Sequence, residues 1–196
     1  MVIPLLAVIW YTVFVWQPLS FWLLMPAGIL VLVFYSLLLS GKEIFPNELK
    51  WEDVLWGLIS AFILYIIYLL GYKIGTFFLP SMVGKIADVY ALAADYNPLL
   101  LAGLMLFIIG PGEEIFWRGF IQQGLAVKYS DYRAFLITAA GYTLVHGITG
   151  NWALMGAAAV AGFFWGGLYF WKKSLWIVII SHAFWEVLVL LILPIG

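Results

Sequence analysis

Cysteine is missing from the 196-residue sequence, and this absence removes several kinds of chemistry at once. Without thiols the chain has no cysteine nucleophile, no thiolate ligand for a metal ion and no disulfide bond. The absence does not assign the protein to a redox compartment, because many proteins in oxidising compartments also lack disulfides.

Charged side chains are also scarce, at 10% of the residues, whereas 66% of the residues are hydrophobic. The mean hydropathy is +1.09, which excludes an ordinary water-soluble domain. The formal net charge of −1 gives no indication of a nucleic-acid partner. Apolar runs of about 20 residues, at ~1.5 Å each, cross a ~30 Å hydrocarbon layer. We therefore expect an all-α, polytopic membrane helix bundle.

Turn residues and charged residues divide the chain into about seven expected membrane spans. The first span lacks the basic residues and the cleavage pattern of a signal peptide, so we expect it to be retained. Asn97 and Pro98 mark the start of the fourth span, because Asn is a good helix N-cap and Pro suits the first helical position. The seven expected spans are 2–16, 19–39, 54–79, 98–125, 132–149, 152–171 and 175–193.

The segment 80–97 has a different pattern from the spans around it. Its apolar residues recur at helical spacing, while Ser81, Lys85, Asp88 and Asp95 lie on the other side. This pattern predicts a short amphipathic helix that either lies in the membrane interface or packs on the protein itself. We expect a single integral membrane domain, with three spans in 1–79, an interfacial segment in 80–97 and a four-span core in 98–193.

Basic residues are distributed unevenly between the connections. If the N-terminus is on one side, the loops 41–53, 126–131 and 172–174 fall on the same side. With their flanking residues these loops carry Lys42, Lys50, Lys128, Arg133, Lys172 and Lys173. The other side carries Lys85, with Lys73 nearby. Because positive residues remain in the cytoplasm, we expect a prokaryotic plasma membrane protein with its N-terminus inside and its C-terminus outside.

Ionisable side chains within the spans are few, and each costs roughly 2.5–3.5 kcal/mol in the membrane, so such residues indicate function. Glu114 and Arg118 have the i, i+4 spacing of an ion pair, and we expect them to support the site structurally. Helix geometry turns Glu113 about 100° away from Glu114. Helical rise places Glu113, His146, His182 and Glu186 roughly 12–21 Å from the basic face of the membrane. We expect these four side chains to share a cavity that opens toward the cytoplasmic half and activates water.

Three short motifs carry a resemblance to a known family. "EEIFWR" fits EExxxR, "YTLVH" is an aromatic residue followed by xxx-His, and "HAFWE" is His-xxx-polar. In this order, each on its own span, they resemble the CAAX prenyl protease and bacteriocin-processing (CPBP or Abi) family of intramembrane endopeptidases. The resemblance covers about 98–190. Two positions depart from the family pattern: Glu186 replaces the usual Asn, and Tyr142 replaces the commoner Phe.

The resemblance implies a role for each site residue. Glu113 would be the general base, His146 would position or activate the water, and His182 would donate to the oxyanion. An ionised Glu186 cannot donate as Asn does. Glu186 either donates as a neutral acid or pairs with His182 and holds it charged; the i, i+4 spacing favours the pair. Gly110-Pro111-Gly112 is expected to loosen the helix before Glu113.

The expected function is that of an intramembrane endopeptidase that needs no metal. A zinc-dependent protease is the first alternative, since Glu113, His146 and His182 are acceptable zinc ligands, although no HExxH pair is present. A proton or ion pathway and a non-catalytic scaffold or immunity protein are further alternatives. The expected partners are the lipid bilayer and a protein or peptide substrate. The resemblance allows prenylated C-termini, leader peptides and C-terminal sorting tails.

Overall fold

The computed structural model describes residues 2–40, 44–45 and 47–196, and every regular element in these ranges is a helix. The predicted all-α class is therefore confirmed. The first helices in chain order are α1 Val2–Tyr11 with η1 Thr12–Trp16, α2 Phe21–Leu39, α3 Trp51–Phe78 and α4 Met82–Ala91. One continuous long helix follows, made of α5 Pro98–Leu104, η2 Met105–Ile109, α6 Gly110–Glu114, η3 Ile115–Gln122 and α7 Gln123–Lys128. The last helices are α8 Asp131–His146 with η4 Gly147–Thr149, α9 Trp152–Lys172, and α10 Leu175–Val187 with η5 Leu188–Ile192.

The expected spans appear as helices of two lengths. By length and composition, five helices are able to cross a membrane: α2, α3, the long helix from α5 to α7, α9, and α10 with η5. Pro4–Trp16 is a shorter apolar helix, and α8 has 16 residues. The protein is thus a polytopic helical membrane bundle, in which two of the seven predicted spans are shorter than the others.

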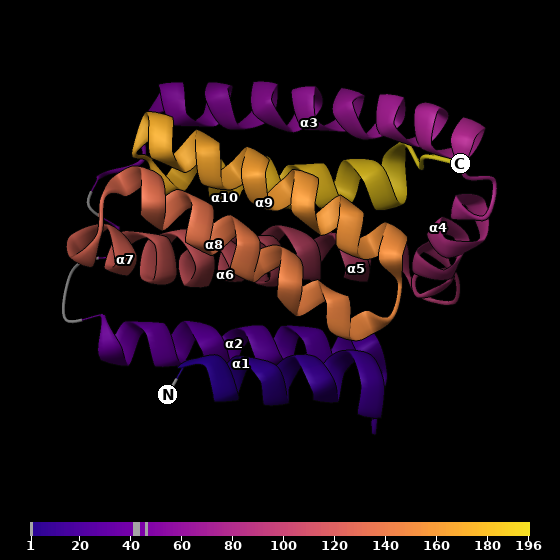
Figure 1. The fold of residues 1–196 in the computed structure, drawn as a ribbon, viewed down its shortest axis with the longest axis horizontal. Coiled ribbons are helices and arrows are strands. Elements are labelled where there is room, and N and C mark those ends of the chain that lie inside the picture. The colour runs from indigo at the N-terminus through magenta and orange to yellow at the C-terminus, as the bar shows by residue number, and fades with distance from the viewer. Residues whose placement is uncertain (1, 41–43, 46) are drawn as a thin grey trace.

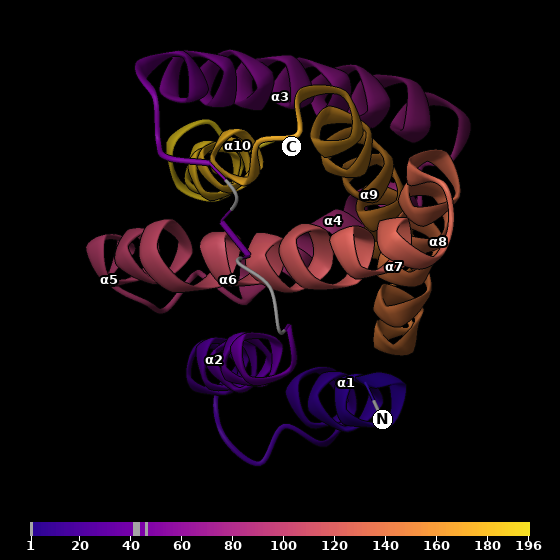
Figure 2. The ribbon, with the colours of Figure 1, turned by 90° about the vertical axis from the view of Figure 1, so that its left-hand side faces the viewer.

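The helices form layers about the long helix that runs from α5 to α7. Figures 1 and 2 show α1 and α2 on one side of this helix and α10, α9 and α3 on the other side. Helix α10 packs against both α3 and α6, and α8 packs along α9. The long helix therefore lies at the centre of the bundle, where its polar residues are shielded from lipid.

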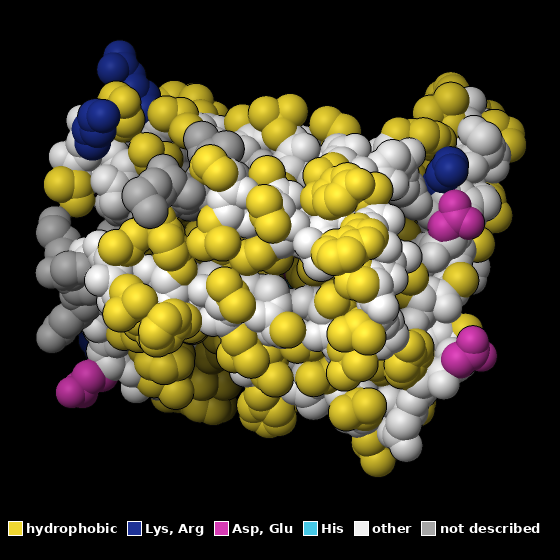
Figure 3. Space-filling model, turned by 90° about the horizontal axis from the view of Figure 1, so that it is seen from below, with side chains coloured by type: hydrophobic (Ala, Val, Ile, Leu, Met, Phe, Trp, Pro, Cys, Tyr) yellow, Lys and Arg dark blue, Asp and Glu magenta, His cyan; other side chains and the backbone are white. Residues whose placement is uncertain are grey.

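The two ends of the bundle differ in their content of Lys and Arg residues. The C-terminal ends of α2, α7 and α9 lie at one end of the bundle, and α4 and the C-terminus lie at the other (Figure 1). We call these the basic end and the α4 end. Figure 3 shows Lys and Arg side chains gathered at the left, which is the basic end, with hydrophobic side chains across the face made by α1 and α2. The described basic residues of that end are Lys50, Lys128, Arg133, Lys172 and Lys173.

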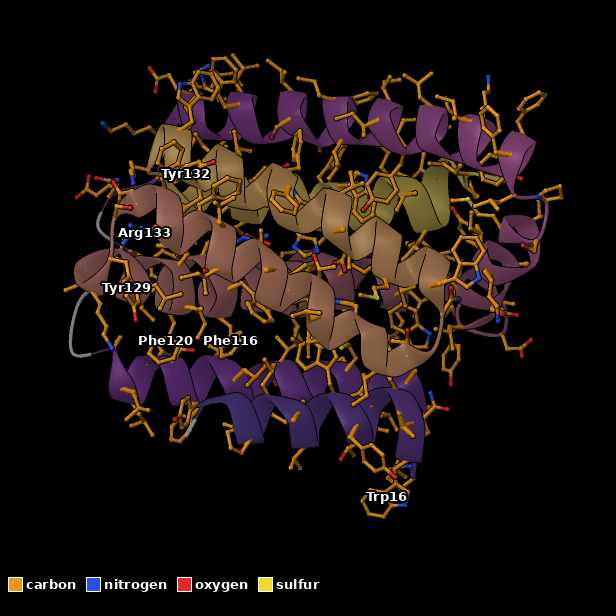
Figure 4. The ribbon with its side chains drawn as sticks, viewed as in Figure 1. Trp16, Phe116, Phe120, Tyr129, Tyr132 and Arg133 are labelled. Atoms are coloured by element: carbon orange, nitrogen blue, oxygen red, sulfur yellow. The ribbon has the colours of Figure 1, made fainter. Side chains whose placement is uncertain are left out.

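Exposed aromatic side chains mark both ends of the apolar band. Figure 4 shows Tyr129 and Tyr132 beside Arg133 at the basic end, and Trp16 at the end of η1, away from them. All three aromatic side chains are exposed. Because Trp and Tyr concentrate at membrane–water interfaces, this arrangement fits a bundle whose long axis crosses the bilayer.

Polar caps explain where several helices begin. The Asn97 side chain accepts hydrogen bonds from the backbone N–H groups of Leu99 and Leu100, so the predicted start of the fourth span is confirmed. Helix α3 begins at Trp51, three residues before the predicted position 54. The Asp53 carboxylate accepts a hydrogen bond of 2.9 Å from the Lys50 backbone N–H, which stabilises the first turn.

Helix α4 is packed on the protein, which is one of the two arrangements expected for segment 80–97. The Asn151 side chain donates to the Lys85 carbonyl over 2.8 Å. The Tyr90 hydroxyl donates to the Val189 carbonyl over 3.0 Å and accepts from the Ile195 N–H over 2.8 Å. These bonds hold α4 across the ends of α9 and α10.

The Gly110-Pro111-Gly112 sequence does not interrupt the long helix. The expected loosening takes the form of π-helical turns, η2 before it and η3 after it. A Cβ atom on Gly110 would lie 2.7 Å from the Ala183 Cα of α10, and one on Gly112 would overlap Ile29 of α2. The two glycines therefore let α10 and α2 approach the long helix at the level of Glu113.

Candidate active site

A cavity of about 490 Å³ lies inside the bundle, and three helices bring ionisable side chains to it. Glu113 comes from α6, His146 from the last residue of α8, and His182 and Glu186 from α10. The first three side chains are almost fully buried. The residues that the sequence predicted to share a cavity therefore line the same one.

Tyr142 fixes the carboxylate of Glu113. The Tyr142 hydroxyl donates a hydrogen bond of 2.8 Å to Glu113 Oε2. The Tyr142 ring is buried, packs edge-on against Trp117 and lies 5.0 Å from the Arg118 guanidinium carbon. A Phe side chain would fill the same space but leave this oxygen of Glu113 without its donor. The departure from the family pattern at Tyr142 is therefore a contact with the carboxylate expected to act as the base.

His146 is oriented by its own helix. Its Nδ1 lies 2.7 Å from the Tyr142 carbonyl oxygen, and because a carbonyl only accepts, Nδ1 carries the proton. The ring packs against the Trp10, Phe14 and Tyr142 rings. In the neutral imidazole, Nε2 is therefore the basic nitrogen of His146, whose side chain faces the cavity.

Glu114 joins two partners rather than one. Its Oε1 accepts from Arg118 Nη1 over 2.8 Å, as the i, i+4 spacing predicted, and from His182 Nδ1 over 2.7 Å. The Glu114 and Arg118 side chains have no exposed surface. Glu114 thus connects α6 to α10 and sets the direction of the His182 ring, in addition to pairing with Arg118.

His182 lies between two carboxylates and against an indole. Its Nε2 is 3.6 Å from Glu186 Oε1, one helical turn away. The Trp165 ring stacks on the imidazole, with centroids 3.7 Å apart and planes inclined by 19°. The Trp165 indole N–H donates to the Ser181 hydroxyl over 3.1 Å. These contacts together fix the orientation of the His182 ring.

Small residues of α9 supply backbone acceptors to the long helix. Arg118 Nη2 donates to the Gly162 carbonyl over 3.3 Å, and Gln122 Nε2 donates to the Gly166 carbonyl over 3.0 Å. A Cβ on Gly162 would lie 3.1 Å from the Tyr142 ring, and one on Gly166 would lie 3.0 Å from Phe135. The two glycines allow close helix contact and make these carbonyls available to buried donors.

The cavity extends toward the α4 end. Its lining includes Met82 and Lys85 of α4, Trp152 at the start of α9, and Ile195 near the C-terminus. The prediction that the site opens toward the basic, cytoplasmic half was wrong. That prediction followed from residue counts along each helix. The position of the cavity instead depends on the sizes of the side chains that meet between the helices.

The described residues do not gather into a metal-binding group. Within residues 2–40, 44–45 and 47–196, no three His, Cys, Asp or Glu side chains have an arrangement that would hold a metal ion. His182 Nδ1 is occupied by Glu114, and His146 Nδ1 by a carbonyl. In each ring Nε2 is the nitrogen that these bonds leave for a ligand, and among the described residues Glu113, His146 and His182 do not have the arrangement of a metal site.

Two contributions to the site were missed from the sequence. The Tyr142 hydroxyl and the Trp165 ring both touch predicted site residues, but only Tyr142 lies within a recognised motif. The signal for Trp165 is its position between Gly162 and Gly166, where small residues bring α9 close to α8, and the Trp165 ring reaches His182 of α10.

Comparison with known families gives one result for the second half of the chain. Residues 95–188 match the family model described as type II CAAX prenyl endopeptidase Rce1-like. Neither the curated proteins nor the solved structures contain a match to the chain. The matched region starts at the cap of α5 and ends in η5, and so includes every site residue described above. Residues 95–188, a little under half of the chain, are thus similar to the Rce1-like family of type II CAAX prenyl endopeptidases.

Proposed function

We propose that the protein hydrolyses a peptide bond of a substrate held at the membrane, with water activated by Glu113 and no metal ion. One observation carries this proposal: three helices direct a carboxylate and two imidazoles into one buried cavity. Similarity of residues 95–188 to the Rce1-like family supports a protease, and buried groups of this kind serve general acid–base chemistry.

In the proposed reaction Glu113 removes a proton from a water molecule, and the oxygen adds to the scissile carbonyl carbon. His146 Nε2 accepts a hydrogen bond from the same water and orients it. The carbonyl oxygen becomes an oxyanion. When the C–N bond breaks, Glu113 returns the proton to the leaving nitrogen, so that the products are a carboxylic acid and an amine.

His182 stabilises the oxyanion in this scheme. Glu114 accepts a hydrogen bond from Nδ1–H, and Glu186 lies 3.6 Å from Nε2, so that carboxylates on both sides hold the imidazole charged. The Nε2–H group is only loosely engaged at this distance, because a hydrogen bond is shorter. It is therefore able to turn to the developing oxyanion, which is a stronger acceptor.

The test compares two isosteric substitutions. Membranes containing wild-type protein, Glu113→Gln or Glu52→Gln are analysed by mass spectrometry of newly formed peptide termini. Glu52 lies exposed in the first turn of α3, so its substitution is a matched control. We expect Glu113→Gln to abolish the cleavages that the wild type and the control produce. Equal cleavage by Glu113→Gln would remove Glu113 from the mechanism.

The zinc-dependent alternative needs a separate measurement. Purified protein is treated with a strong chelator, dialysed and assayed on the peptides found in the first experiment. We expect cleavage to persist. Activity that is lost on chelation and restored by zinc would favour the metalloprotease reading, with Glu113, His146 and His182 as its ligands.

A further inference from the structure

The cavity runs from buried ionisable side chains to lining residues near α4 that are partly exposed, such as Lys85 and Trp152. Glu113, His146, His182 and Glu186 lie at its inner end, and residues of α4 lie at the other. Toward the basic end the space beside the long helix is filled by Phe116, Trp117, Arg118 and Gln122, all buried. The described lysines and arginines of the basic end do not line the cavity. A substrate therefore has room to approach the inner end from the α4 side.

The lining of the approach is apolar. Trp22, Tyr72, Met82 and Trp152 are among the residues between the mouth and the inner end. Of the described residues that line the cavity, Lys85 is the charged one outside the inner cluster, and its ammonium lies 3.7 Å from Asp88. Such walls favour apolar side chains, because a charged segment would lose its hydration without gaining partners.

The distribution of basic residues indicates which side of the membrane the α4 end of the cavity, here called the mouth, faces. Lys50, Lys128, Arg133, Lys172 and Lys173 gather at the basic end (Figure 3). Membrane proteins retain such clusters in the cytoplasm. The mouth, at the opposite end of the bundle, then faces the non-cytoplasmic side.

We propose that the substrate is an apolar peptide segment that enters the cavity from the non-cytoplasmic side, past α4. This inference rests on the proposed function and specifies its substrate. The scissile bond lies in the outer half of the bilayer or at its outer surface. Tails of exported or membrane-anchored proteins have this position, whereas lipid-modified C-termini displayed in the cytoplasm do not.

The absence of native cysteine allows a direct test by thiol labelling. Lys85→Cys places a thiol in the lining, and Asp88→Cys places one on the exposed side of the same helix; both remove the same ion pair. Lys128→Cys reports the basic end. Intact cells and inside-out vesicles are treated with a large membrane-impermeant maleimide, and Glu113-dependent cleavages are measured afterwards by mass spectrometry.

In intact cells we expect both α4 cysteines to be labelled and Lys128→Cys to be unlabelled. Labelling of Lys85→Cys is expected to cause loss of cleavage, whereas labelled Asp88→Cys retains it. Met82→Cys, which also lines the mouth, replaces Lys85→Cys if that variant is poorly folded.

Two results would overturn the inference while leaving the proposed function in place. One is labelling of the α4 cysteines only in inside-out vesicles, since the mouth would then face the cytoplasm. The other is unchanged cleavage after complete labelling of the lining cysteine, since the substrate would then enter elsewhere. If the unlabelled proteins show no Glu113-dependent cleavage, the proposed function itself fails, and this inference fails with it.

Discussion

The two halves of the long central helix are both helical, but they have different surroundings. From η2 to Glu113 the helix borders a cavity, whereas from Phe116 to Gln122 it is buried in packed side chains. Figure 4 shows Phe116 and Phe120 directed from the long helix toward α2 in the packed half. The comparison shows that the proposed catalytic residues line a hollow bordered by small side chains of α9, and that the adjoining half of the helix is closely packed.

Glu113 and Glu114 show this difference between adjacent residues. Glu113 faces the cavity and accepts from Tyr142, while Glu114 is enclosed with Arg118 and His182. A helix turns each residue about 100° from the one before, so one step separates the two environments. The following substitutions test whether the two halves really have separate roles.

The largest expected effect is on the packed half, with Arg118→Ala. This change leaves Glu114 buried beside His182 with one partner fewer, and breaking a buried pair costs roughly 3–5 kcal/mol. We expect a clearly lower melting temperature in detergent together with lost cleavage. Glu113→Gln is the contrasting variant, with lost cleavage and nearly unchanged melting. Normal melting of Arg118→Ala would assign Arg118 to the chemistry instead.

The second substitution acts at the boundary, with Tyr142→Phe. It deletes the hydroxyl that donates to Glu113 and keeps the ring that packs on Trp117. A hydrogen bond to a charged group contributes about 1.5–3 kcal/mol, so we expect kcat to fall roughly ten- to hundred-fold. KM should change little, and the melting temperature should fall by less than it does for Arg118→Ala. Tyr142→Leu, which also loses the ring, is expected to lower both kcat and stability; a Phe variant with wild-type kcat would show that the hydroxyl does not position Glu113.

The third substitution tests the close approach of α10. Gly110→Ala would put a Cβ 2.7 Å from the Ala183 Cα, and overpacking of this kind costs about 1–3 kcal/mol. The control is Gly103→Ala in the same helix, where a Cβ meets nothing within 4 Å. We expect reduced melting temperature and activity for the first and a neutral result for the second. Equal behaviour of the two variants would mean that helix contact at Gly110 does not hold the site together.

The smallest effect is expected for Glu186→Asn. Its carboxylate lies 3.6 Å from His182 Nε2, which is longer than a hydrogen bond, so its hold on the imidazole is weaker than that of Glu114 at 2.7 Å. We expect kcat to fall by several-fold, with His182 still held by Glu114. An Asn variant with an unchanged rate at every pH measured would make Glu186 a structural residue.

Sequence patterns predicted those features of the structure that depend on a single helix. Apolar length gave the spans, and the i, i+4 rule gave the Glu114–Arg118 pair. The contact of Glu114 with His182 was not predictable in this way, because the two residues are 68 positions apart and meet only through the close packing at Gly110. The direction of the cavity was missed for a related reason. It depends on small residues of α9, such as Ala158 and Ala161, facing the site where large ones would fill it.

The backbone carbonyls of α9 that accept hydrogen bonds allow the neighbouring side chains of α9 to change in evolution. Arg118 and Gln122 are held by the carbonyls of Gly162 and Gly166, and a carbonyl is present whatever side chain its residue carries. The register of α9 against the long helix is therefore independent of the α9 residues that face the cavity, such as Ala157, Ala158 and Ala161. Enlarging or reducing these side chains would reshape the cavity while the contacts of Arg118 and Gln122 with α9 stay in place. A single scaffold is in this way able to acquire new cleavage preferences by changes on one helix face.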